Sequence, residues 1–167
     1  MKKTVLIALL AMLAVSCGIV KYSFTGTSIQ PDVKTITIPY VEYKALRVNP
    51  SLSNDLTEAL KEKYRKLTRL EEVDVDGDLE LVCEITGYDV KATAVTADEQ
   101  AAQNRLTVQV KVEFTNKKYP EDNVSSNFSA YEDFDATLSL DAVEGGLCET
   151  IVEKIVEDIF NATVAQW

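Results

Sequence analysis

The clearest pattern in the chain is a strict alternation of apolar and polar side chains over residues 106–115. The apolar positions fall on one side and the polar positions on the other: Leu106, Val108, Val110, Val112 and Phe114 against Thr107, Gln109, Lys111, Glu113 and Thr115. Side chains of a strand point alternately to the two faces of a sheet, so this period predicts a strand with one buried and one solvated face. Antiparallel sheets commonly have such a dry and a wet face.

Three further segments have the same period with less regularity. They are residues 34–40, residues 79–86 and, more weakly, residues 124–136. Pro39 has no N–H group to donate to a neighbouring strand, so we expect 34–40 to be an edge strand or to end there. The buried face of this first strand is expected to carry Ile36, Ile38 and Tyr40. The polar loop "NKKYPEDN" at 116–123 is expected to join the third and fourth strands as a hairpin.

Apolar side chains spaced three and four residues apart predict a helix over about 49–69. The shared face consists of Leu52, Leu56, Leu60, Tyr64 and Leu67. Asn49 followed by Pro50 is typical of a helix start, and Ser53 with Asp55 offers an alternative start. Acidic residues lie early in the segment and basic residues lie late, which suits the helix dipole.

A second helix is predicted over 141–165, where two adjacent apolar ridges form a wide stripe. The ridges are Val143, Leu147, Ile151, Ile155 and Ile159, and Cys148, Val152, Val156, Phe160 and Val164. Asp141 and Glu144 have the spacing of a capping box. Gly145 and Gly146 interrupt the pattern at a cost of about 1 kcal/mol each relative to alanine. Either the helix begins after them, or the backbone approaches another element closely there.

The order of elements is therefore β-α-β-β-β-α, which predicts an α+β fold. Each strand has one apolar face and each helix one apolar stripe. The economical arrangement is a two-layer sandwich, with two helices packed on one face of a four-stranded mixed sheet. The other face of the sheet, with Thr107, Gln109, Lys111 and Glu113, is left polar and available for contacts.

The first residues of the chain have a different character. Met1-Lys2-Lys3 precedes an apolar run over 4–15, as in a signal peptide, and this run is shorter than the roughly 20 residues that span a bilayer. Small residues then lead to Cys17, as in the lipobox of bacterial lipoproteins, where cleavage precedes a cysteine that becomes acylated. The alternative is an ordinary secretory signal with an incidental cysteine.

Cleavage before Cys17 would divide the chain into three parts. These are a lipoprotein signal peptide over 1–16, a lipid-anchored tether over 17–33 and a single domain over 34–167. Attachment of palmitate and further acyl chains to Cys17 would be stable, because two or more chains hold a protein to a membrane far better than one.

Net charge narrows the class of partner. Without Lys2 and Lys3, 15 basic side chains remain against 27 acidic ones, for a net charge of −12. This balance argues against nucleic acid, whose binding depends on neutralising phosphates, and against a general affinity for anionic lipid surfaces. The main basic cluster, which is either a solvated helix end or a contact for an anionic partner, consists of Lys61, Lys63, Arg65, Lys66 and Arg69.

The chain offers little for catalysis or metal binding. It contains no histidine, the commonest general base and metal ligand. No pairing of a nucleophile with a base is apparent, so we expect no enzyme activity, no cofactor and no metal site. The aspartates of 74–78 lack the spacing of an EF-hand calcium loop and are interpreted as a solvated turn. Cys83 and Cys148 are interpreted as two buried thiols, with one disulfide as the alternative.

Several segments taken in order resemble the LptE family of lipopolysaccharide-assembly lipoproteins, in the form found in Bacteroidetes. They are "CGIVKYSFTGTSI", "TITIPY", "NPSLSNDLTEALKEKYRKLTRL", "GDLELVCEITGYDV", "RLTVQVKVEFTNKK", "FSAYEDFDA" and "VEDIFNATVAQW". The resemblance covers nearly the whole chain after residue 16, and its specificity comes from the order of the segments. The fold of the family agrees with the fold predicted above.

The resemblance implies a periplasm-facing lipoprotein of the outer membrane. It would plug the LptD β-barrel, which exports lipopolysaccharide, and assist the assembly of that barrel. The acidic charge makes binding to LptD a firmer expectation than direct binding to lipopolysaccharide. Contacts with the glycolipid or a partner are expected at Lys61, Arg65, Arg69, Lys117 and Lys118. The alternative is a stand-alone lipoprotein that binds another envelope protein or a small ligand.

Overall fold

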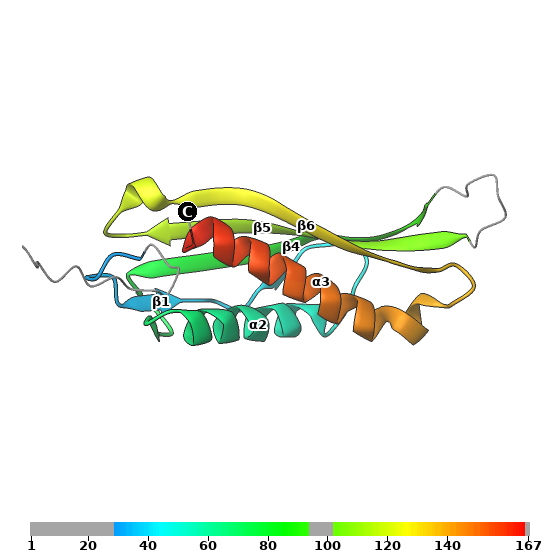
Figure 1. Ribbon diagram of the computed structural model, residues 1–167, viewed down its shortest axis with the longest axis horizontal. Helices are drawn as coiled ribbons and strands as arrows, with labels where there is room; N and C mark the ends of the chain where they lie inside the picture. Colours follow the sequence, from blue (N-terminus) through cyan, green and yellow to red (C-terminus); the bar gives the residue numbers. More distant parts are fainter. Residues whose placement is uncertain (1–28, 94–101, 166–167) are drawn as a thin grey trace, which may run out of the picture.

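The computed structural model describes residues 29–93 and 102–165, so the predicted signal peptide and Cys17 lie outside the described residues (Figure 1). The elements follow the predicted order with two short strands added. The strands are β1 (Thr35–Thr37), β2 (Glu42–Tyr43), β3 (Glu71–Glu72), β4 (Leu79–Thr93), β5 (Gln103–Asn116) and β6 (Val124–Asp135). The helices are α2 (Leu52–Leu67), α3 (Leu140–Thr163) and the 3-10 turn η1 (Pro120–Asp122).

The sheet is mixed, and both helices lie on one side of it (Figure 1). Its strand order is β3-β1-β4-β5-β6, with β2 also paired to β4. The short strands β1 and β2 run parallel to β4, while β4, β5 and β6 form an antiparallel meander. The α+β prediction is confirmed, but four strands is too few. The extra strands have two residues each, which is too short for an alternating pattern to be visible in the sequence.

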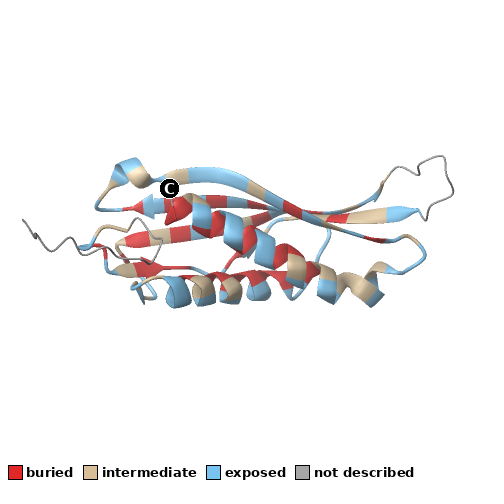
Figure 2. Ribbon diagram, viewed as in Figure 1, coloured by how far each residue is buried: buried red, intermediate tan, exposed pale blue. Residues whose placement is uncertain are grey.

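The core lies between the helices and the sheet (Figure 2). All five apolar side chains of the predicted face of β5 are buried, at most 3% exposed. The α2 stripe is buried through Tyr64, but Leu67 is 43% exposed because the helix ends there. The two helices meet where the ring of Tyr64 stands edge-on to Phe160, with centroids 5.2 Å apart.

The first strand departs from prediction at its end. Ile36 and Ile38 are buried, but Tyr40 is 61% exposed, so the three do not share a buried face. The strand β1 stops at Thr37, before Pro39, as the missing N–H group requires. It is not an edge strand, because β3 and β4 flank it on both sides.

The start of α2 depends on Asn49. Its side-chain oxygen accepts hydrogen bonds from the backbone N–H groups of Ser51 (3.0 Å) and Leu52 (3.1 Å), which have no partner within the helix. The helix is assigned only from Leu52, and Ser51 makes no side-chain capping bond. Of the two predicted starts, the one at Asn49 therefore describes the capping correctly.

The start of α3 corrects two predictions. Ser139 precedes the helix without a side-chain capping bond, so the capping box is wrong. Glu144 instead accepts a hydrogen bond from the hydroxyl of Tyr88, on the sheet. The helix runs straight through Gly145 and Gly146, and a Cβ placed on either would have no neighbouring atom within 4 Å. Neither predicted explanation of these glycines holds.

Candidate functional site

The predicted basic residues are divided between α2 and the β5–β6 loop. Lys117 and Lys118 lie in that loop, at the end of the molecule where the described chain begins (Figure 1). Lys61, Arg65 and Arg69 belong to the last two turns of α2 and the residues after it, which lead into β3 at the same end.

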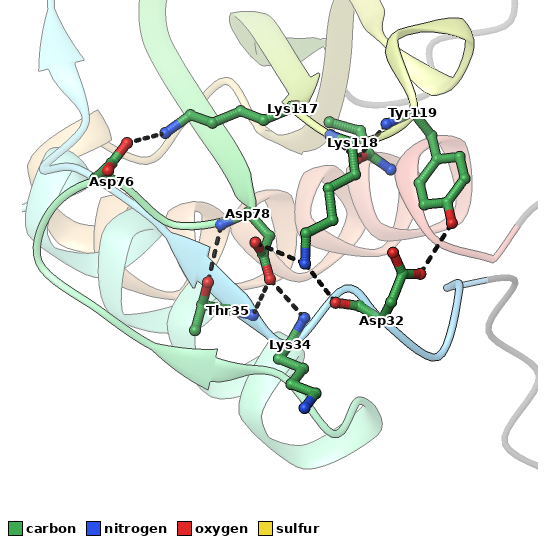
Figure 3. A network of polar contacts seen from close by, with 9 residues as sticks. Asp32, Lys34, Thr35, Asp76, Asp78, Lys117, Lys118 and Tyr119 are labelled. Atoms are coloured by element: carbon green, nitrogen blue, oxygen red, sulfur yellow. Dashed lines mark hydrogen bonds and ion pairs between the residues drawn. The ribbon is translucent and has the colours of Figure 1, made fainter.

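Asp78 is the centre of a polar network at this end (Figure 3). One oxygen of its carboxylate accepts hydrogen bonds from the backbone N–H groups of Lys34 (2.8 Å) and Thr35 (3.3 Å). The other oxygen lies 3.0 Å from the ammonium of Lys118. The N–H of Lys34, followed by the ammonium of Lys118, lowers the pKa of Asp78 to about 2. The carboxylate is therefore ionised at neutral pH, and it joins β1, β4 and the β5–β6 loop.

The same loop also holds the segment that precedes β1. The ammonium of Lys118 donates to the backbone carbonyl of Asp32, and the hydroxyl of Tyr119 donates to the Asp32 carboxylate at 2.9 Å. Lys117 donates at 2.8 Å to Asp76, whose backbone has a positive φ of 59° in the turn before β4 (Figure 3). The structure thus places both lysines in contacts within the chain. The turn predicted over 74–78 is closed by them.

The basic residues of α2 have more varied surroundings. Lys61 pairs with Glu72 of β3 at 2.8 Å. Lys61 and Arg65, one turn apart, line a hollow of about 210 Å³ that also includes Leu70 and the buried Ile36. Arg65 and Arg69 are exposed and form no ion pair with any residue of the described ranges. Among the five predicted contact residues, these two are the ones without an ion pair in the described part of the chain.

The sheet face opposite the helices is polar, as predicted. It consists mainly of hydroxyl, amide and paired charged side chains. Lys111 pairs with Glu113 at 2.8 Å, and Arg105 binds both oxygens of Asp133 at 2.7 and 2.9 Å. The guanidinium carbon of Arg105 also lies 3.7 Å from the ring centre of Tyr131, a cation–π contact.

A bulge in β4 shapes the middle of this face. The register between β4 and β5 shifts between Ile85 and Gly87. A Cβ on Gly87 would lie 2.9 to 3.1 Å from three atoms of the Gln109 side chain. Glycine therefore leaves room for Gln109 to lie across the strand, and it keeps the surface low at that point.

Inside the core, Cys83 and Cys148 are buried free thiols, as preferred from the sequence. Burial raises the pKa of Cys83 to about 12, so the thiol stays protonated and unreactive. Cys148 lies within 3.6 Å of the Asn49 amide and 3.8 Å of the Tyr88 hydroxyl. In the described part of the chain, no group of three or more side chains suited to a metal ion is found.

The sequence did not indicate the contacts of Asp32, Asp78 and Tyr119. Their partners in this network lie 40 to 87 residues away in the chain, and no local motif marks them. From the sequence alone, the aspartates of the turn over 74–78 are interpreted as a solvated turn. The sequence does contain two adjacent lysines in the 116–123 loop and several aspartates in the 74–78 turn, and these opposite charges could have suggested a contact.

Comparison with known proteins gives the family. The model for LptE, described as lipopolysaccharide assembly, matches residues 33–163. A hypothetical protein from Chlamydia trachomatis has a similar structure at 8% identity, with a TM-score of 0.53, over 80% of this chain and 99% of that one. A minor lipoprotein from Acinetobacter baumannii has 12% identity and a TM-score of 0.49, over 76% of this chain and 89% of that one. A comparison with curated protein sequences finds no match.

The likeness to the chlamydial structure concerns the fold, whereas the family match covers most of the chain. None of the helices within 29–93 and 102–165 is long and apolar enough to span a membrane. The match over residues 33–163 includes all the strands and both long helices. The chain belongs to the LptE family, whose role is in lipopolysaccharide assembly.

Proposed function

We propose that this protein is an outer-membrane lipoprotein that plugs an LptD-like lipopolysaccharide-export barrel and assists its assembly. It would be held at the periplasmic side of the membrane through acylated Cys17, and its role would be structural rather than catalytic. Family membership supports the role in lipopolysaccharide assembly. The anchor is supported by the signal-like sequence of residues 1–16 and by the cysteine that follows it.

The observation that carries the proposal is the open polar face of the sheet. The lumen of a membrane barrel is polar, and its membrane-embedded band is about 25 Å tall. The longest strand, β4, has 15 residues and so extends about 50 Å. The open face is therefore long enough to line such a lumen over its whole membrane-embedded height.

The charges on this face also favour contact with a polar wall. Three of its cations are paired within the chain: Lys111 with Glu113, Arg105 with Asp133, and Lys44 with Glu42 at 3.0 Å. Lys91, opposite Arg105, is exposed and forms no ion pair with a described residue. Paired charges already have part of their hydration replaced, so covering them removes less stabilisation than covering unpaired charges. Hydroxyl and amide groups between them can exchange hydrogen bonds with the polar side chains of a barrel lumen.

Co-purification tests the proposal. Tagged full-length protein, extracted from native membranes in mild detergent, should bring down a large β-barrel protein. Ser129, exposed on β6 opposite Gln109, lies on the open face, and Ser129→Arg should reduce recovery of the barrel at least about tenfold. Ala142→Arg adds the same charge at an exposed position of α3 and should leave recovery unchanged.

Two results would reject the proposal. Absence of any barrel from the wild-type preparation would favour the stand-alone lipoprotein instead. Equal recovery with Ser129→Arg and Ala142→Arg would remove the open face from the interface. The anchor is tested separately, because Cys17→Ser should release the protein into the soluble fraction in cells that lack the barrel. Full membrane retention of that variant would overturn the anchor.

Contact with lipopolysaccharide is a finer part of the proposal. Arg65 and Arg69 are the favoured positions, because Lys61, Lys117 and Lys118 already have acidic partners. A planar guanidinium suits phosphate groups, which it can bind through two parallel hydrogen bonds. Replacing both arginines with serine should weaken binding of lipopolysaccharide to the purified chain, whereas Lys117→Ser should change it less.

A further inference from the structure

A groove runs between α2 and α3 on the outer side of the helix layer. Its volume is about 780 Å³, and its floor includes the side chains of Ala59, Val152 and Val156. The groove lies on the opposite side of the molecule from the open sheet face, because both helices cover one side of the sheet (Figure 1). It has no part in the proposed contact with a barrel.

The walls of the groove are strongly acidic. Six carboxylates line it, three from each helix: Asp55, Glu58 and Glu62, and Glu149, Glu153 and Glu157. Two lysines reduce this charge, since Lys63 pairs with Glu157 and Lys66 pairs with Glu62 at 2.5 Å. The other four carboxylates form no ion pair with any residue that the structure describes.

The groove between the two acidic rows is long enough to hold a short helix. The two helices run in the same direction (Figure 1). Because each helix carries one acidic row, the rows lie along opposite walls of the groove. From Asp55 to Lys66 the α2 wall extends about 17 Å at 1.5 Å per residue, which equals about three helical turns. A row of like charges three and four residues apart destabilises its own helix.

Gly145 is a second, independent observation at the same groove. It forms part of the lining near the start of α3, where glycine also weakens the helix. No other part of the described chain uses the space above it, since a Cβ placed there would contact nothing within 4 Å. The groove thus combines two features that are unfavourable for the isolated chain. Such departures from local preference are expected at functional sites.

We propose that this groove is a docking site for a basic helical segment of a partner protein. Lysine and arginine heads of that segment would pair with the four unpaired carboxylates, while their aliphatic stems cover the apolar floor. Gly145 would let the backbone of the segment approach α3 closely. A second copy of this chain, with a net charge of −10, would be repelled, as would nucleic acid or the phosphates of a glycolipid.

A matched pair of variants tests the site. The probe is a synthetic helical peptide of about 14 residues, with lysines on both sides of an alanine–leucine stripe. Wild-type protein should bind it, and Gly145→Leu should weaken binding at least about tenfold by filling the groove. Gly146→Leu makes the same change at the next residue, which is exposed but does not line the groove, and should keep wild-type affinity. Circular dichroism of both variants should show an unchanged fold.

The variants separate docking from general attraction between opposite charges. Both leave the charge of the protein unaltered, so equal affinity of Gly145→Leu and Gly146→Leu for the peptide would overturn the proposal. Failure of the wild-type protein to bind the peptide would overturn it as well. Glu149→Lys with Glu153→Lys should abolish binding. Barrel co-purification should be unaffected by Gly145→Leu, so the test is independent of the function proposed above.

Discussion

At the end of the sheet that holds the β5–β6 loop, the aspartates are bound by donors from distant segments. In the groove between α2 and α3, four of six carboxylates have no cationic partner among the described residues. Asp78 joins three segments that are far apart in the chain, whereas Glu149 and Glu153 line the groove without an ion pair to any described residue. Paired charges of the first kind fix the shape of the protein. Under the docking proposed above, the unpaired carboxylates of the second kind would be neutralised by a basic partner.

The largest expected effect is at Asp78, at the end of the sheet that holds the β5–β6 loop. Asp78→Asn removes the charge that holds Lys118 and weakens two hydrogen bonds from backbone N–H groups. We expect a loss of about 1–2 kcal/mol in the free energy of unfolding, measured by urea denaturation. Asp76→Asn is the control, because its carboxylate binds Lys117 alone and asparagine tolerates the same positive φ. An equal or larger loss in the control would contradict the central role of Asp78.

The stabilisation of the fold by the Asp78 carboxylate should also depend on pH. The pKa of Asp78 is about 2 in the folded protein, below its ordinary value of 3.8. Because folding lowers this pKa, the stabilisation is complete above about pH 4 and is lost as the pH falls toward 2. The gap in melting temperature between wild type and Asp78→Asn should therefore shrink over that range, as followed by circular dichroism. A gap that stays constant would show that the carboxylate charge is not its cause.

The two glycines near the start of α3 should respond in the opposite direction. Gly145→Ala and Gly146→Ala should each raise the free energy of unfolding by about 1 kcal/mol, because alanine favours the helix and neither Cβ meets another atom. Thermal unfolding of the single variants measures this. A destabilised Gly145→Ala protein would mean that an unseen contact requires glycine there.

The smallest effect concerns the acidic rows. Neutralising Glu149 and Glu153 with glutamine should leave the stability unchanged or raise it by about 0.2–0.5 kcal/mol, since like charges four residues apart repel each other. Urea denaturation at low salt should detect the gain, and added salt should remove it. A clear loss of stability would indicate that these carboxylates have partners within the chain.

The parts of the fold that follow local rules could be predicted from the sequence. The alternation in β5 and the apolar stripes of α2 and α3 fix which side chains are buried, because period and burial are linked within each element. The strands β2 and β3 could not be found, since two residues give no period. Their existence depends on pairing with β4 and β1 after the chain has folded back.

The candidate sites depended more on tertiary contacts. Lysines 117 and 118 looked available for an external anion, because nothing local shows that Asp76 and Asp78 approach them. The polar face of β5 was predictable from its alternation. The way in which the Gln109 side chain lies across β4 was not, because it depends on the bulge and the glycine at Gly87 in that strand. The acidic groove requires the register between two helices separated by 72 residues of chain, which the sequence does not provide.

If Cys17 anchors the chain as proposed above, the contacts around the segment before β1 have a mechanical consequence. They occur in series along the segment: Gln30 to Asp122, Asp32 to the β5–β6 loop, and Lys34 and Thr35 to Asp78. A pull from the membrane side would load them one after another, starting with Gln30. Each bond that yields would lengthen the tether by a few residues and leave the next one intact. The contacts of the segment would therefore break in sequence, and the pairing of β1 within the sheet would be loaded last.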